Sequence, residues 1–288
     1  MSNLIKKKLT ALVPEAVRKW LLQWPYRRWR NKTEGWYKSY LWTWRISVED
    51  PFDTSGRKKA FREREAKGIS NIPVFLISFN RLSYLQMAIE RFEQMGLTNI
   101  IIIDNVSTYP PLLEYYQKTP YQVITMDQNY GHRVFWECPQ LRQYRNDFYI
   151  VSDPDVLPIE ECPADFVEKM FYVLKKYPNV TKVGLSLKLD DLPEDGVLTD
   201  DVLEHEKQFT KRYIEKENLY IAPVDTTFSI YPPDSNANRK MTFYCAFRTG
   251  YPYQARHLPW YKTKQIITDE DRFYSGLNKF GTWDVVKE

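Results

Sequence analysis

Four apolar runs recur between residues 72 and 155, and each is separated from the next by a stretch with helical spacing. The runs cover residues 73–79, 99–104, 121–126 and 148–151. The intervening helical patterns cover residues 82–95, 112–117 and 133–145. Strands that alternate with helices form a parallel sheet covered on both faces. The pattern therefore predicts an α/β fold with a mostly parallel central sheet flanked by helices.

Polar residues follow each of the four predicted strands. In open sheets of this kind, ligands bind at the carboxyl ends of the strands. The sequence therefore predicts one crevice that is suited to a nucleotide. The segments expected to line it are Ser78-Phe79-Asn80-Arg81, Asp104-Asn105, Asp127-Gln128-Asn129 and Asp153-Pro154-Asp155.

The acidic pair after the fourth strand is the strongest candidate for chemistry. Side chains alternate along a strand, and Pro154 keeps the residue before it extended, so Asp153 and Asp155 are expected to project together. Two hard oxygen ligands suit Mn²⁺ or Mg²⁺, which in turn binds a diphosphate. The alternative is that the aspartates cap a turn before Pro158.

Residues 72–158 resemble the nucleotide-binding half of GT-A glycosyltransferases, particularly the bacterial family-2-like enzymes. The order and spacing of four segments agree with that family. They are Val74-Phe75-Leu76-Ile77-Ser78-Phe79-Asn80-Arg81, Ile101-Ile102-Ile103-Asp104-Asn105-Val106-Ser107, Asn129-Tyr130-Gly131 and Ser152-Asp153-Pro154-Asp155. The resemblance covers less than half of the chain, and Asp104-Asn105 replaces the more usual pair of acidic residues.

This resemblance implies a GT-A (Rossmann-like) fold and a nucleotide-sugar donor that lies over the strand ends. Asp104 would hydrogen-bond the base, or alternatively cap the turn after its strand. Asp153 would contact the ribose or a metal ion, and Asp155 would be the firmer metal ligand. The donor-binding residues it implies are Ser78, Phe79, Asn80, Arg81, Asp104, Asn105, Asn129, Gly131, Arg133 and Asp153.

The second half of the chain must supply the acceptor site and a catalytic base. Asp225 lies 70 residues after Asp155, a separation similar to that of the base in several inverting GT-A enzymes. Asp269 and Glu270 are rivals for this role. Each of the three has a structural alternative: Asp225 would pair with an arginine or cap a turn, and the other two would favour a helix N-terminus.

The aromatic segment around His257 supplies further candidates. Some GT-A enzymes use a late histidine as an additional metal ligand, and neutral imidazole suits Mn²⁺. An isolated histidine can equally serve as a structural hydrogen-bonding residue. Trp260 and Tyr261 would stack on an acceptor sugar or belong to the core.

The N-terminal segment differs from the rest in charge. Residues 1–46 hold 11 Lys and Arg against 2 acidic residues, a net charge of +9, while the remainder carries −5. Six of the nine tryptophans lie in the same segment. Cations beside interfacial aromatics are typical of a helix on an anionic membrane surface, although these residues could instead pack on the catalytic domain. No nucleic-acid motif follows, so a nucleic-acid partner is not expected.

These observations predict a helical extension and linker over residues 1–71 and a catalytic domain over residues 72–288, with halves at 72–158 and 159–288. The expected function is a metal-dependent glycosyltransferase that moves a sugar from a nucleotide-sugar, a UDP-sugar by expectation, to a glycan or lipid-linked acceptor in surface polysaccharide synthesis. Three cysteines without metal spacing favour a reducing compartment. The expected location is cytoplasmic, peripheral on the inner face of the cell membrane.

Two rival functions remain open at this point. A sugar nucleotidyltransferase would share a related sheet and a divalent cation, but usually has a Gly-rich loop after the first strand, and residues 78–81 contain no glycine. A non-catalytic, membrane-associated scaffold would be expected to have lost the acidic pair, which is intact here.

Overall fold

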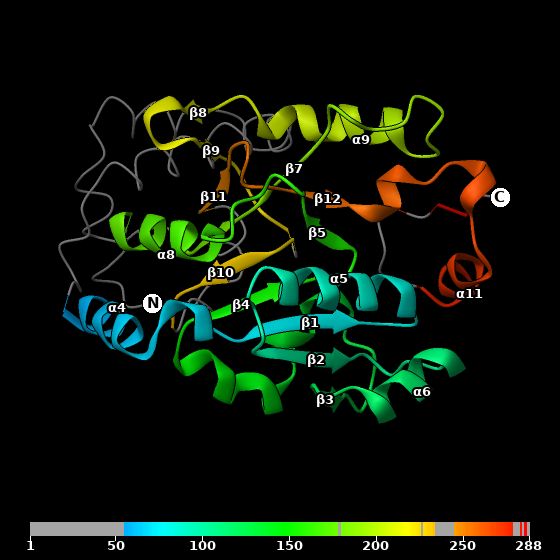
Figure 1. Ribbon diagram of the computed structural model, residues 1–288, viewed down its shortest axis with the longest axis horizontal. Coiled ribbons are helices and arrows are strands. Elements are labelled where there is room, and N and C mark those ends of the chain that lie inside the picture. Colours follow the sequence, from blue (N-terminus) through cyan, green and yellow to red (C-terminus); the bar gives the residue numbers. More distant parts are fainter. Residues whose placement is uncertain are drawn as a thin grey trace, which may run out of the picture. The chain divides into compact units, whose positions relative to one another are not determined.

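The structure of the protein is a computed structural model that describes residues 55–177, 180–225, 227–233, 245–278, 283 and 285–286 (Figure 1). By its contacts the chain divides into two units, residues 1–47 and 48–288, and every described residue belongs to the second. The basic extension predicted over residues 1–46 therefore lies outside the described residues. Within them, no helix combines the length and apolar character needed to cross a membrane.

A nine-stranded sheet forms the centre of the domain, and its strand order is β3-β2-β1-β4-β10-β6-β11-β9-β8. The first four are parallel neighbours: β3 (Gln122–Thr125), β2 (Ile100–Asp104), β1 (Val74–Ser78) and β4 (Tyr149–Ser152). Beyond β4 the sheet is mixed, with β10 (Ser229–Tyr231), β6 (Lys182–Gly184), β11 (Ala246–Thr249), β9 (Leu219–Ile221) and β8 (Tyr213–Ile214). The predicted α/β fold with a central sheet is confirmed, and the parallel part is its first half.

The parallel strands β1, β2 and β4 form where the sequence is mostly apolar, whereas β3 lies at the edge of the sheet and is only partly buried. All five residues of β1 and all five of β2 are buried, as expected for strands covered on both faces. Ser78 at the end of β1 pairs in register with Asp104 at the end of β2. The register therefore places the polar ends of these strands at one edge of the sheet.

A smaller three-stranded sheet has the order β5-β12-β7, with β5 at Val156–Pro158, β12 at Gln254–His257 and β7 at Ser186–Leu187. Strand β12 runs antiparallel to β5, so His257 pairs with Val156. This pairing places His257 next to Asp155, which it follows in the chain by about a hundred residues.

The central sheet is flanked by helices, and the described residues contain seven α-helices. They are α4 (Ser55–Lys67), α5 (Leu82–Gln94), α6 (Pro110–Lys118), α7 (Val134–Glu137), α8 (Phe166–Lys176), α9 (Thr199–Glu206) and α11 (Asp269–Leu277). The prediction of a single helix over residues 133–145 was wrong in the length of that helix. Helix α7 has four residues, and a 3-10 helix over Pro139–Asn146 follows it, because Pro139 cannot continue the α-helical hydrogen bonds.

The core has two layers, one on each face of the sheet. On one face, Phe92 of α5 and Phe166 of α8 both contact Phe228, with ring centroids 5.2 and 5.1 Å apart. On the other face, Tyr149 and Tyr231 stack at 5.0 Å on neighbouring strands. The parallel strands β1 and β2 point toward the end of the domain that holds α11, while α4 lies toward the other end (Figure 1).

Candidate active site

The loops after the parallel strands are hydrogen-bonded to one another. Asn80, which has a φ of 51°, accepts hydrogen bonds on Oδ1 from the backbone N–H groups of Thr108 (2.6 Å) and Tyr109 (2.9 Å) in the loop after β2. Asn105 donates from Nδ2 to the carbonyl of Gly131 at 2.9 Å. The structure thus brings the ends of β1, β2 and β3 together, as the strand pattern predicted.

Asp155 lies between two other predicted site residues, just beyond β4. Its Oδ2 is 3.9 Å from Nη1 of Arg81, and its Oδ1 is 3.7 Å from Nε2 of His257. The three side chains are 17%, 4% and 14% exposed, respectively. A carboxylate, a guanidinium and an imidazole from three distant segments therefore meet in one largely buried cluster.

The guanidinium of Arg81 is flanked by aromatic rings. Its Cζ lies 3.8 Å from the ring centroid of Tyr274 and 4.8 Å from that of Tyr84. Nε and Nη1 of Arg81 have no hydrogen-bond acceptor among the described residues. A buried donor without a partner costs about 1–3 kcal/mol, so an anionic ligand at these atoms would be stabilised by a side chain that is already oriented.

Burial favours the neutral form of the His257 imidazole. Burial lowers the pKa of His257 below its usual value, although the nearby carboxylate of Asp155 opposes this. Its Nδ1 has no hydrogen-bond partner within the described part of the chain. The buried ring of Trp260 packs against the imidazole with centroids 4.8 Å apart.

The predicted metal ligands come together only in part. The described residues contain no group of three His, Cys, Asp or Glu side chains arranged to hold a metal ion. Oδ1 of Asp155, which lacks a hydrogen bond among these residues, lies 3.7 Å from Nε2 of His257, whereas the imidazole nitrogen that lacks one is Nδ1. A carboxylate oxygen and a neutral imidazole nitrogen suit Mn²⁺. These two fit part of a coordination shell that phosphate oxygens and water would complete.

Two predicted donor-binding residues are buried and occupied by local contacts. Asp104 accepts hydrogen bonds on Oδ1 from the backbone N–H of Ser107 at 3.0 Å and the hydroxyl of Tyr116 at 3.3 Å. The same hydroxyl lies 2.8 Å from Oγ of Ser78. This is the turn-capping arrangement that was the alternative for Asp104, and recognition of a base by Asp104 stays a prediction.

The other predicted donor residues occupy several environments. Asn129 accepts from the backbone N–H of Gly131 at 2.8 Å and so shapes the loop after β3. Phe79 packs on Tyr274, with centroids 6.1 Å apart. Arg133 is mostly exposed and its Nη1 lies 4.0 Å from Glu137. Asp153 is half-buried, and it is not part of a three-residue metal cluster in the described structure.

The three carboxylates predicted as candidate bases have different surroundings. Glu270 accepts hydrogen bonds from the backbone N–H groups of Leu82 (2.7 Å) and Ser83 (3.2 Å) at the start of α5. Asp269 is exposed and lies 3.5 Å from Arg272. Asp225 is exposed, and only its backbone carbonyl receives a hydrogen bond from the described residues, at 3.3 Å from Nζ of Lys182.

The two predicted acceptor-binding aromatics are also unlike each other. Trp260 is 1% exposed and belongs to the core behind His257. Tyr261 is half-buried, and its hydroxyl lies 2.6 Å from Oδ1 of Asp191. A sugar could therefore reach the ring of Tyr261 but not that of Trp260.

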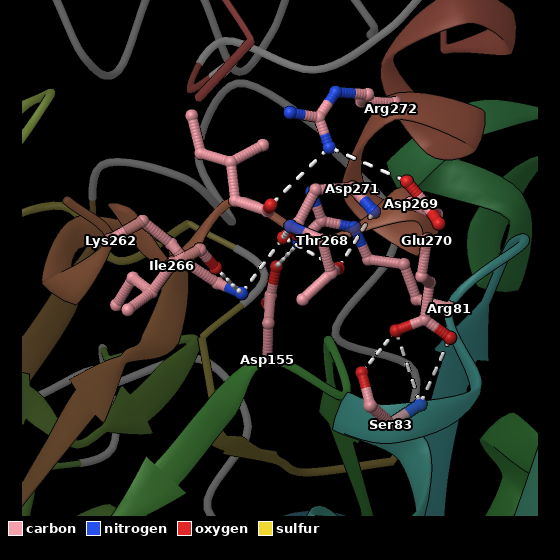
Figure 2. A network of polar contacts seen from close by, with 11 residues as sticks. Arg81, Ser83, Asp155, Lys262, Ile266, Thr268, Asp269, Glu270, Asp271 and Arg272 are labelled. Atoms are coloured by element: carbon pink, nitrogen blue, oxygen red, sulfur yellow. Dashed lines mark hydrogen bonds and ion pairs between the residues drawn. The ribbon is translucent and has the colours of Figure 1, made fainter. Parts of the chain in front are cut away.

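Sequence reasoning missed Tyr84 and Tyr274, whose rings flank the Arg81 guanidinium, and Lys262, whose Nζ lies 5.6 Å from the ring centroid of Tyr84. The spacing of Arg81 and Tyr84 carried a signal, because residues three apart share one face of a helix. Tyr274 and Lys262 carried none, because their contacts join segments far apart in the chain. Figure 2 shows the polar network to which Arg81, Asp155 and Lys262 belong.

No protein-family model matches the chain, and no curated protein matches it. Some solved structures are similar at low identity. A glucosyl-3-phosphoglycerate synthase from Mycobacterium tuberculosis in complex with Mn²⁺, UDP-glucose and phosphoglyceric acid is 12% identical, with a TM-score of 0.37, over 65% of this chain and 63% of that one. A UDP-glucose pyrophosphorylase complexed with UDP-glucose is 11% identical, with a TM-score of 0.41, over 71% of this chain and 99% of that one. No family is assigned on likenesses this remote.

Proposed function

We propose that the protein is a metal-dependent glycosyltransferase that uses a nucleotide-sugar donor, with UDP as the expected nucleotide. The observation that carries this proposal is the cluster of Asp155, Arg81 and His257 at the carboxyl edge of the parallel strands. It combines a carboxylate and a neutral imidazole, which suit a divalent cation, with a guanidinium that has unused donors, which suits a phosphate. A diphosphate that binds with a cation can use both.

Each residue of the cluster has a defined part in this proposal. Asp155 and His257 would hold a Mn²⁺ or Mg²⁺ ion, which when bound neutralises charge on the departing nucleoside diphosphate. Arg81 would donate hydrogen bonds from Nε and Nη1 to the diphosphate. The two aromatic rings against its guanidinium keep this cation oriented without consuming its donors.

Asp225 is the base that we propose for deprotonating the acceptor hydroxyl. Glu270 is engaged by backbone amides, whereas no described residue forms a hydrogen bond or ion pair with the Asp225 carboxylate. A carboxylate available in this way can accept a proton during attack by the acceptor. The proposed acceptor is a glycan or a lipid-linked glycan of surface polysaccharide synthesis.

The test is donor binding and turnover by the full chain and by Asp155→Asn, which keeps the size of the side chain. We expect the parent to bind UDP more tightly with Mn²⁺ than with a chelator. We expect Asp155→Asn to lose this difference and to reduce release of UDP from UDP-sugars by about 100-fold or more, as for other groups that stabilise developing charge. The matched control is Asp195→Asn, which makes the same substitution at an exposed carboxylate outside the cluster.

Two results would contradict the proposal. One is parental UDP release by Asp155→Asn in a screen of UDP-sugars, and the other is full turnover in excess chelator. Release of pyrophosphate in place of UDP would assign the chain to the nucleotidyltransferases instead.

A further inference from the structure

We propose that helix α11 positions Arg81 against Asp155, and that Glu270 and Tyr274 are the positioning residues. This inference rests on the proposed function, because it assigns the device that orients a residue of the donor site. Glu270, a candidate catalytic base by sequence, would then have a structural role that acts through Arg81.

Glu270 caps helix α5 from a distant part of the chain. Arg81 is the N-cap residue of α5 and provides no side-chain cap. Oε1 of Glu270 instead accepts from the backbone N–H of Leu82 at 2.7 Å and of Ser83 at 3.2 Å, and Oε2 contacts Oγ of Ser83 (Figure 2). A carboxylate at a helix N-terminus satisfies free N–H groups and complements the helix dipole. The backbone immediately after Arg81 is therefore held by α11.

Tyr274 holds the side chain that this backbone presents. It lies one turn along α11 from Glu270, as residues four apart do, and its ring centroid is 3.8 Å from Cζ of Arg81. Tyr84 contacts the same guanidinium from α5 at 4.8 Å. The aromatic contacts restrict the guanidinium to an orientation in which Nη1 approaches Asp155 at 3.9 Å.

Helix α11 is itself anchored, so it can act as a fixed support. Its N-terminus has a capping box in which Oγ1 of Thr268 accepts from the N–H of Asp271 and Asp271 accepts from the N–H of Thr268. The buried carboxylate of Asp271 also pairs with Nζ of Lys262 at 2.8 Å. Hydrogen bonds from Lys262 and Thr268 lower the pKa of Asp271, although its burial opposes this. The same helix reaches the loop after β2, where Phe273 packs on Tyr109 at 5.1 Å.

The test measures binding of UDP with Mn²⁺ to the full chain by calorimetry. We expect Glu270→Gln and Tyr274→Leu each to weaken binding by about tenfold, a typical effect of residues that act through another. Tyr274→Phe keeps the ring, and Arg272→Gln changes an exposed cation of α11 whose contacts stay with Asp269 and Ile267. Both controls should bind within about twofold of the parent.

Two further measurements separate positioning from a general loss of structure. In an Arg81→Met background, Glu270→Gln should weaken binding no further, because its effect passes through Arg81. Hydrogen exchange at the amides of Leu82 and Ser83 should accelerate in Glu270→Gln, while exchange in β1 and β2 stays unchanged.

The inference is overturned if Glu270→Gln and Tyr274→Leu bind UDP with Mn²⁺ like the parent. It is also overturned if these substitutions weaken binding by the same factor in the Arg81→Met background as in the parent. If Asp155→Asn and Arg81→Met also bind like the parent, the proposed function fails as well. If those two lose binding while the α11 variants keep it, only the role of α11 is rejected.

Discussion

Among single residues, Lys182 is in the least expected position. It is a buried lysine at the start of β6, and its Nζ lies 3.3 Å from both the carbonyl of Asp225 and the hydroxyl of Tyr231. Burial lowers the pKa of Lys182 to about 7, and the Asp225 carboxylate limits this decrease. The charged form of this side chain is therefore disfavoured in the folded state.

This predicts that the protein becomes more stable as the pH rises above neutral. The folded-state pKa of about 7 lies below the unfolded value of about 10.4, so the unfolded state binds more protons between these limits. The contribution of Lys182 to the free energy of unfolding should rise by up to about 1.4 kcal/mol per pH unit across this window. Thermal melts of the wild type and Lys182→Met from pH 7 to 9 measure it, with exposed Lys211→Met as the control. Parallel pH profiles for the wild type and Lys182→Met would contradict the assignment.

Among the elements, α4 is the one whose packing on the sheet domain is least evident from its own sequence. Phe61 packs on Phe148 and Phe171, with ring centroids 4.8 and 5.0 Å apart. Arg64 donates to Oδ2 of Asp147 at 2.6 Å. Although burial of Asp147 acts in the opposite direction, hydrogen bonds from Lys67 and Arg64 lower the pKa of its carboxyl. Helix α4 is thus part of the sheet domain, within the segment predicted as an extension and linker.

We therefore expect Asp147→Asn to destabilise the protein at pH 7 by about 1–3 kcal/mol, because the buried guanidinium of Arg64 loses its charged partner. The pKa of Asp147 is depressed in the folded state, so its contribution is present above the unfolded value of about 3.9 and is lost as the pH falls through the folded value. Lys67→Gln, which removes the exposed partner, should cost less than about 1 kcal/mol. Urea unfolding at pH 7 and pH 3 checks both, and equal losses for the two variants would disprove the ranking.

For the whole molecule, the basic N-terminal segment remains a prediction, because residues 1–46 lie outside the described structure. We propose that it binds an anionic membrane surface and keeps the catalytic domain beside a lipid-linked acceptor. Each Lys or Arg near such a surface contributes about 1 kcal/mol. Deletion of residues 1–46 should release the protein from phosphatidylglycerol vesicles in sedimentation, while UDP binding is retained. Undiminished vesicle binding would reject this role.

The strands β1, β2 and β4 and helix α5 were predictable because their hydrophobic periods are local properties of the chain. Their parallel order also predicted that Arg81 and Asp155 would lie at one edge, since parallel strands end together. The helix predicted over residues 133–145 is shorter than its apolar spacing suggests, because Pro139 ends the α-helical hydrogen bonding after Glu137. The spacing of apolar residues continues past a proline, although the backbone hydrogen bonds of the helix do not.

The sequence by itself thus determined the parallel part of the sheet, its polar edge and the acidic pair, because these depend on residues close together in the chain. Only the tertiary structure decided which charges meet. His257 reaches Asp155 because β12 pairs with β5, and Glu270 reaches an amide 188 residues away because α11 packs on the start of α5. The physical reason is that a side chain's partner depends on how distant elements pack, and the spacing of residues within one element carries no record of that packing.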